Sequence, residues 1–263
     1  MRVPSLLLAL LLAPAAARAA PIEAVYAVQA AGVTVVEATV QFDFSTPDGY
    51  AIEVRHRTRG IASVFVSADM VSRTTGRWVD NRARPTRFSS EGTYRGEQRR
   101  TLLEYVNGQP AVRSLVPPNE GERESVAPEL QRGTIDSLSG VAQLAQDIRR
   151  TGRCEGQART FDGRRLTEFR VRTAGWEMIP PARDTWSGRA LHCRFVGQLL
   201  AGFRFDDDAS DRRPQEGDAW MAEVRPGEPP IPVRLEVPSK WFGSTVIILT
   251  RVGEPAATGT ATR

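Results

Sequence analysis

The 263-residue chain has few of the side chains on which many enzymes depend. It contains two histidines, two cysteines and a single lysine, Lys240. No G-x-S-x-G sequence marks an activated serine, and no C-x-x-C spacing marks a redox or metal-binding thiol pair. After residue 19, no run of about 18 uncharged apolar residues could cross a bilayer as a helix. These absences argue against serine hydrolases of that type, thiol oxidoreductases and helical membrane proteins.

The first residues have the pattern of a secretory signal peptide. Arg2 gives a charged start, residues 5–12 form an apolar run too short to span a bilayer, and residues 17–19 supply the small side chains that signal peptidase recognises. No cysteine follows the run, so we expect no lipid-modified N-terminus. We therefore expect residues 1–19 to be removed and the protein to be periplasmic, without a transmembrane segment.

The charge balance gives no reason to expect a nucleic-acid partner. Removing Arg2 and Arg18 lowers the formal net charge from +4 to +2. A nearly neutral chain whose cations are almost all arginine is typical of a salt-bridged, solvated surface. Because no Ser/Gly/Pro linker divides the sequence, we expect a single β-rich domain over 20–252 and a flexible tail over 253–263.

One principal α-helix is expected at about 135–150. Its apolar residues recur with a period near 3.6 and form one stripe: Ile135, Leu138, Val141, Ala142, Ala145 and Ile148. Thr134 or Asp136 could cap the first turn by accepting a hydrogen bond from a backbone N–H. Gly152 suits the left-handed residue beyond the last turn.

The rest of the chain has short alternating segments separated by turn residues. Residues 22–44 predict a hairpin around Gly32, and Asn107-Gly108 predicts another. The apolar stretch 61–70 fits either a strand or a short helix. One helix is too little to cover both faces of a large sheet. We therefore predict a mainly β fold, with a single antiparallel sheet curled into a barrel, half-barrel or spiral and the helix packed over an open end or face.

The two cysteines of an exported protein are most simply one disulfide, Cys154–Cys193. It would close a loop of about 40 residues, for which the chain-entropy treatment gives roughly 4 kcal/mol. The alternative is a pair of free thiols, reactive or metal-binding, which only His56 and His192 could join. We expect the disulfide, and neither a metal nor a cofactor.

Several motifs together resemble a known family. The most specific is Gly-Thr-Ile-Asp-Ser-Leu at 133–138, followed by Cys154 and by Phe-Asp-Gly at 161–163. The others, in chain order, are Tyr26-x-Val28 with Gly32, Asp48-Gly49-Tyr50, Arg59-Gly60, Cys193, Ala201-Gly202-Phe203 and Pro232-Val233-Arg234-Leu235. Over nearly the whole mature chain they resemble an exported bacterial family known as domain of unknown function 3108. The resemblance implies a mostly antiparallel β protein of the Gram-negative periplasm, similar in shape to the curled sheets of lipoprotein carriers, and brings no catalytic residues.

Candidate catalytic and metal-binding groups have simpler explanations. Ser137 and Ser139 have no histidine near them in the sequence and fit a helix N-terminus. His192 alternates with Cys193 and is expected at the surface. The acidic run 206–211 resembles the start of a calcium loop but has neither the glycine at the sixth position nor the glutamate at the twelfth.

Aromatic side chains give the best indication of binding. Trp241 and Phe242 follow Pro238 in an expected exposed turn, and Trp220 is a third candidate contact for a ligand or partner. The first hypothesis is therefore a non-enzymatic envelope protein that binds an apolar or glycan ligand, a lipid for example, or an envelope-protein partner. An open interior of the curled sheet would favour this function, and a filled interior would exclude a carrier.

The alternative hypothesis is an envelope hydrolase that acts on peptidoglycan or glycan. Its candidate carboxylates are Asp136, Glu168 and Asp206. Paired carboxylates can serve as acid and base in glycoside hydrolysis only at a defined separation across the site. The sequence does not give that separation.

Overall fold

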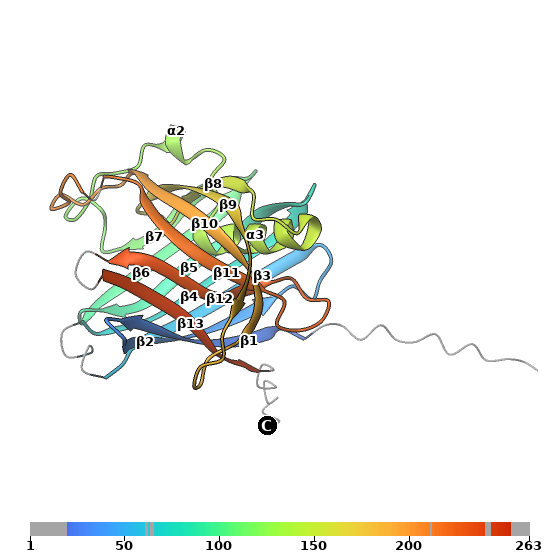
Figure 1. Ribbon diagram of the computed structural model, residues 1–263. Coiled ribbons are helices and arrows are strands. Elements are labelled where there is room, and N and C mark those ends of the chain that lie inside the picture. The colour runs from blue at the N-terminus through green and yellow to red at the C-terminus, as the bar shows by residue number, and fades with distance from the viewer. Residues whose placement is uncertain (1–19, 61–62, 64–65, 211, 240–242, 254–263) are drawn as a thin grey trace, which may run out of the picture.

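The computed structural model describes residues 20–60, 63, 66–210, 212–239 and 243–253. Its strands form a 13-stranded antiparallel sheet that is nearly closed into a barrel (Figure 1). In chain order the strands are β1 (Ile22–Ala30), β2 (Val33–Asp43), β3 (Gly49–Thr58), β4 (Ala68–Val79), β5 (Arg82–Tyr94), β6 (Glu97–Val106), β7 (Gln109–Val116), β8 (Gly156–Phe161), β9 (Leu166–Ile179), β10 (Gly188–Ala201), β11 (Gln215–Ala222), β12 (Ile231–Ser239) and β13 (Gly243–Gly253). The predicted antiparallel curled sheet is confirmed.

The order of the strands in space follows from the order in the chain. Consecutive strands pair within β1–β7 and within β8–β13, and β1 pairs with β13 to join the two halves. The edges of the sheet are therefore β7 and β8. The connection from one edge to the other carries the helices α2 (Pro128–Gln131) and α3 (Ser137–Thr151). The helical segment is thus the link between the first and second halves of the sheet.

The predicted hairpins at Gly32 and Asn107-Gly108 are confirmed. In both turns the two central residues have positive φ: 48° and 77° at Ala31-Gly32, and 50° and 75° at Asn107-Gly108. Such backbone angles match the right-handed twist of the adjoining strands. Asn107-Gly108 favours such angles by its own residue types, whereas Ala31 adopts a φ that alanine rarely takes.

Helix α3 packs inside the curl, against β3, β4, β5 and β8 (Figure 1). Its buried face consists of Ser139, Ala142, Ala145 and Ile148. Three of these four side chains are small, so the helix backbone can come close to the strands. The principal helix predicted at about 135–150 is confirmed.

The entry into α3 differs from the prediction. Ile135 belongs to no helix: its N–H donates to the carbonyl of Arg159 at 3.1 Å, and its carbonyl accepts from the N–H of Phe161 at 2.8 Å. This bridge to β8 delays the helix until Ser137. The hydroxyl of Thr134 donates to the carbonyl of Gln131 at 2.7 Å, so Thr134 closes the turn after α2 and does not cap α3.

The seam between the two edges is closed by one arginine. Arg164, in the β8–β9 turn, donates to the carbonyls of Val116 at 2.9 Å and Pro117 at 2.7 Å, just after β7. It also donates to Oδ1 of Asn119 at 3.2 Å. These bonds take the place of a β ladder between β7 and β8.

The predicted disulfide Cys154–Cys193 is present, with a Cα–Cα distance of 5.7 Å. Gly152, with φ 70°, ends α3 and donates its N–H to the carbonyl of Ile148 at 2.7 Å. Both cysteines are buried in a cluster with Ile148 and the β10 side chain Leu191. The bond therefore attaches the C-terminus of the helix to the sheet.

Some sequence predictions lie outside the described residues. They are the signal peptide over 1–19, the contacts proposed for Trp241 and Phe242, and all of the tail except residue 253. Of the ambiguous stretch 61–70, residues from Ala68 onwards belong to β4. In the part of the chain that is described, no helix has the length and apolarity needed to cross a membrane.

Candidate functional site

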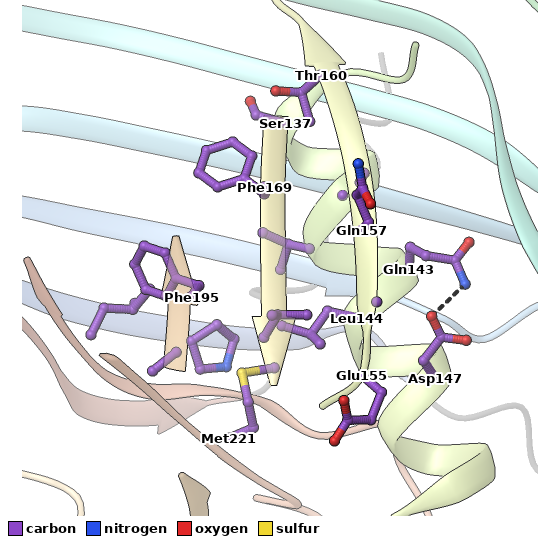
Figure 2. Close-up of a pocket in the computed structure, with 18 of the residues that line it drawn as sticks. Ser137, Gln143, Leu144, Asp147, Glu155, Gln157, Thr160, Phe169, Phe195 and Met221 are labelled. Atoms are coloured by element: carbon purple, nitrogen blue, oxygen red, sulfur yellow. Dashed lines mark hydrogen bonds between the residues drawn. The ribbon is translucent and has the colours of Figure 1, made fainter. Parts of the chain in front are cut away.

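A half-open cavity of about 280 Å³ lies between α3 and strands β8–β12 (Figure 2). Its lining is chiefly apolar and comes from α3, strands β8–β12, the start of β5 and the α3–β8 connection: Arg82, Ser137, Gly140, Val141, Gln143, Leu144, Asp147, Glu155, Gly156, Gln157, Ala158, Thr160, Phe169, Val171, Phe195, Ala219, Met221, Pro232 and Leu235. The helix contributes positions three or four apart, which is one stripe. We call this space the interior cavity.

The cavity exists partly because α3 has a glycine in its middle. Gly140 lines the cavity, and a Cβ built on it would meet only Cγ2 of Thr160, at 3.6 Å. A larger side chain at this position would project into open space. In a helix interior, glycine costs about 1 kcal/mol relative to alanine. Gly140 therefore lowers the stability of α3 at the position that borders the cavity.

On the sheet side, two phenylalanine rings lie over glycines of the next strand. Phe169 pairs with Gly197 and Phe195 pairs with Gly217. A Cβ on Gly197 would come within 2.8 Å of the Phe169 ring, and one on Gly217 within 2.8 Å of Cε2 of Phe195. The glycines thus let both rings lean along the sheet and leave the cavity open. Figure 2 shows Phe169, Phe195 and Met221 on this side.

The polar part of the lining is built around Gln143 of α3. Its Oε1 accepts from the N–H of Ala83 at 2.6 Å, and its Nε2 donates to the carbonyl of Asn81 at 3.0 Å and to Oδ2 of Asp147 at 3.0 Å. These bonds dock the β4–β5 turn onto the helix. They also hold Arg82, which follows the turn, beside the cavity.

A buried polar cluster fixes the start of α3. Asp136 is the N-cap: its Oδ1 accepts from the N–H of Ser139 at 2.9 Å, and its Oδ2 accepts from the Ser139 hydroxyl at 2.6 Å. Thr74 donates to the same Oδ2 at 3.0 Å, and Tyr50 donates to Oγ of Ser139 at 2.8 Å. Burial raises the pKa of Asp136 above its usual range, although the hydrogen bonds from Ser139 and Thr74 oppose this. The cluster contains no histidine, and it explains Ser139 as a structural residue.

The three carboxylates of the hydrolase hypothesis are not brought together. Asp136 is fully buried at the helix cap. Glu168 precedes the cavity-lining Phe169 on β9, so its side chain points to the other face, where it pairs with Arg170 at 2.7 Å. Asp206 is exposed and accepts a hydrogen bond from Arg204, which lowers the pKa of this aspartate. Each of the three carboxylates is therefore engaged with partners of its own.

His192 is buried rather than exposed, which corrects the sequence prediction. It is 7% exposed and lies between two carboxylates, with Nδ1 2.7 Å from Oε1 of Glu177 and Nε2 2.6 Å from Oδ1 of Asp218. Because the carboxylates meet different nitrogens, the three groups do not form a metal site.

Trp220 is part of the same cluster. It lies between its cross-strand partners His192 and Arg234. The histidine ring is stacked on it at 4.6 Å, and the guanidinium carbon of Arg234 lies 5.4 Å from its centre. Its Nε1 donates to Oε2 of Glu177 at 2.8 Å. With neighbours on both ring faces, Trp220 has no face for stacking on a sugar, so its role as a ligand contact stays a prediction that this geometry does not favour.

Within the described ranges, no group of three or more His, Cys, Asp or Glu side chains is placed to hold a metal ion. The oxygens of the acidic run that are described serve local turns: Oδ2 of Asp207 accepts from the N–H of Arg204 at 2.7 Å, and Oδ1 of Asp208 accepts from the N–H of Ser210 at 2.6 Å. This part of the run is a hydrogen-bonded surface loop.

Comparison with known proteins gives a family and a fold. A family model described as "Protein of unknown function (DUF3108)" matches residues 23–250 and confirms the resemblance noted in the sequence. A search of curated proteins found no match. A solved β-barrel-like protein of domain of unknown function DUF1849 from Brucella abortus is similar in fold, with 15% identity, a TM-score of 0.52, and coverage of 90% of this chain and 98% of that one.

A weaker likeness links the chain to two further structures. One is described as "a putative lipoprotein" from Parabacteroides distasonis, with 10% identity, a TM-score of 0.40, and coverage of 90% of this chain and 96% of that one. The other is described as "a putative exported protein with YmcC-like fold" from Bacteroides fragilis, with 11% identity, a TM-score of 0.36, and coverage of 89% and 95%.

The sequence did not point to the cavity residues Phe169, Phe195 and Met221. Only Phe169, between Glu168 and Arg170, alternates with polar residues on both sides, which indicates that it faces inward. An inward-facing pattern is the same for a filled core and for an open cavity. The distinguishing signal was a glycine opposite each phenylalanine, which becomes visible only when the strand register is known.

Proposed function

The chain belongs to the DUF3108 family of proteins of unknown function, and we propose that it is an exported, non-enzymatic protein that binds one apolar chain in the interior cavity. The observation that carries this proposal is a half-open, mainly apolar space kept clear by glycines on both of its walls. Small-molecule sites are typically concave, chiefly apolar and about 300–1,000 Å³ in volume. The volume of about 280 Å³ is therefore suited to one small apolar molecule or a single slender chain rather than to a branched lipid.

Burial of apolar surface supplies the driving force. Each square ångström of apolar surface removed from water contributes about 25 cal/mol, before the cost of association. Phe169, Leu144 and Met221 offer such surface from three different elements. Since the walls are held by the disulfide, the helix cap and the sheet, little conformational entropy is lost when a ligand enters.

The periplasm is the proposed location. The charged start, the short apolar run and the small residues at 17–19 support export by a cleaved signal peptide. Lipid chains that move between membranes must cross an aqueous compartment there. A glycan ligand receives less support, because Trp220 lacks a free ring face.

Gly140→Leu tests the site directly. The leucine would occupy the middle of the cavity, and it replaces a glycine with a good helix former. We expect wild type to bind the neutral dye phenylnaphthylamine with increased fluorescence, and Gly140→Leu to bind it at least tenfold more weakly without losing thermal stability. Gly140→Ala is the matched control, because a single methyl group takes up little of the space.

Native mass spectrometry of protein purified from periplasm provides a second test. We expect a mass increment that disappears in Gly140→Leu. A wild-type protein that binds neither the dye nor any co-purified chain would overturn the proposal.

A further inference from the structure

We propose that Arg82 makes the interior cavity selective for single-chain amphiphiles with a carboxylate head, that is, for fatty acids. This inference rests on the proposed binding of an apolar chain. It adds the chemistry of the head group, which neither the apolar walls nor the family specify.

The position of Arg82 is fixed by the turn that precedes it. Asp80 and Asn81 have φ values of 52° and 60°, which form the tight β4–β5 turn. Gln143 of α3 bonds to both sides of this turn, at the carbonyl of Asn81 and the N–H of Ala83. Arg82 lies between these two anchored residues and lines the cavity. Its backbone is therefore held at the polar end of the site before any ligand arrives.

Arg82 is the unpaired cation of the cavity lining. Of the lining carboxylates, Asp147 lies 3.7 Å from Arg150, and Glu155 lies 3.1 Å from Arg153. Among the described residues, by contrast, no carboxylate lies within ion-pair distance of Arg82, and the side chain is exposed. The two acidic groups of the lining thus have their own arginines, and one positive charge remains for a ligand.

The geometry suits a carboxylate head with an apolar tail. Figure 2 shows Gln143 and Asp147 on the opposite side of the view from Phe169 and Phe195. Because Gln143 bonds to the residues on both sides of Arg82, Arg82 enters the lining from the side away from the two rings. A chain placed against the aromatic side would leave its head near Arg82, close to solvent. A planar guanidinium can bind a carboxylate through two parallel hydrogen bonds, and an exposed head avoids the cost of full desolvation.

Competition with the bound dye distinguishes the contribution of the head group to affinity from that of the apolar chain. We would measure displacement of phenylnaphthylamine by decanoate, decanol and decylamine, which share one chain and differ in head-group charge. In wild type we expect decanoate to bind about tenfold more tightly than decanol, and decylamine more weakly than either, as a charge-assisted hydrogen bond predicts. Added salt should reduce the advantage of decanoate and leave decanol unchanged.

Two variants assign the effect to Arg82. Arg82→Gln should bring decanoate to the affinity of decanol, and Arg82→Glu should make decylamine the preferred ligand. Arg84→Gln is the matched control, because Arg84 is also exposed on β5, has the same charge and does not line the cavity. It should keep the preference for decanoate. Circular dichroism and thermal melting would verify that each variant is folded.

The outcomes separate this inference from the proposed function. Equal affinity for decanoate and decanol in wild type, or an undiminished preference for decanoate in Arg82→Gln, would overturn the role of Arg82 while leaving the cavity as a binding site. Failure of wild type to bind the dye or any of the three ligands would overturn both.

Discussion

Thr74 on β4 donates a hydrogen bond to Oδ2 of Asp136, the N-cap of α3, at 3.0 Å. The two residues are 62 positions apart in the chain. This bond links a strand of the first half of the sheet to the helix that lies between the two halves. The position of α3, and with it one wall of the interior cavity, is therefore set by a polar contact as well as by apolar packing.

Replacing Asp136 should separate its capping role from its charge. Because burial raises the pKa of Asp136 in the folded state, the protonated carboxyl favours folding. The stabilisation by the protonated Asp136 carboxyl is fully present below the pKa of this group in the unfolded chain, about 4. It is lost as the pH rises through the higher pKa of the same group in the folded protein. Asp136→Asn keeps a cap acceptor but cannot ionise, so its stability relative to wild type should increase as the pH rises above about 4. Urea unfolding across this pH range measures the difference.

Asp136→Ala is the corresponding control. It removes the cap and leaves the hydroxyls of Ser139 and Thr74 without their acceptor. We expect a loss of about 2 kcal/mol or more at every pH. Equal stability of the alanine and asparagine variants would contradict the capping role.

Breaking the disulfide should loosen α3 before the sheet. For a sequence separation of 39, the chain-entropy treatment predicts a loss of about 4 kcal/mol. The variant with both Cys154→Ser and Cys193→Ser should keep its β-rich circular dichroism, melt several degrees lower and show faster amide exchange first within Ser137–Thr151. Quantitative thiol labelling of native wild type should find no free thiol. Uniformly faster exchange over all strands would count against the bond as a helix anchor.

Gly217→Ala should close the cavity from the sheet side. The added methyl group would meet the ring of Phe195, which must then turn away from β11. We expect weaker dye binding than in wild type, together with a loss of stability of about 1–3 kcal/mol from overpacking. The double variant Gly217→Ala with Phe195→Leu removes the clash with the ring but keeps the 3.0 Å contact with the carbonyl oxygen of Glu236, so it should recover part of both losses. Unchanged dye affinity in the single variant would show that this ring does not border the bound ligand.

His192 should be needed chiefly as the partner of two carboxylates. His192→Leu leaves Glu177 and Asp218 without the imidazole ring that lies between them. Because both carboxylates are partly exposed, solvent reduces the penalty, and we expect a loss of about 1–2 kcal/mol. Adding Glu177→Gln and Asp218→Asn should restore most of it. A cycle that treats the two carboxylate changes as one step, with urea unfolding of each variant followed by circular dichroism, measures the coupling, and strictly additive effects would show that no coupling exists.

Much of the fold was predictable because its signals are local. The Asn107-Gly108 turn takes up backbone angles that its own residues favour, and in the Ala31-Gly32 turn the glycine does so. The alternation of side chains identifies the strands, and the period near 3.6 identifies α3. The two cysteines allow a single intramolecular pairing. These features depend on short-range sterics and on burial of one face, so the sequence by itself determined a curled antiparallel sheet with one tethered helix.

The interior cavity was decided by the tertiary structure. Phe195 lies over Gly217 because of the strand register, and Gly140 faces open space because of how α3 is rotated against β8–β12. His192 is buried because Glu177 and Asp218 come from the two neighbouring strands. Ile135 pairs with β8 instead of starting the helix, because an edge strand nearby offers unpaired backbone groups. Each of these features depends on which residues meet across the sheet. The pattern of apolar and polar positions along a single segment does not carry that information, because it is the same for a filled core and for an open cavity.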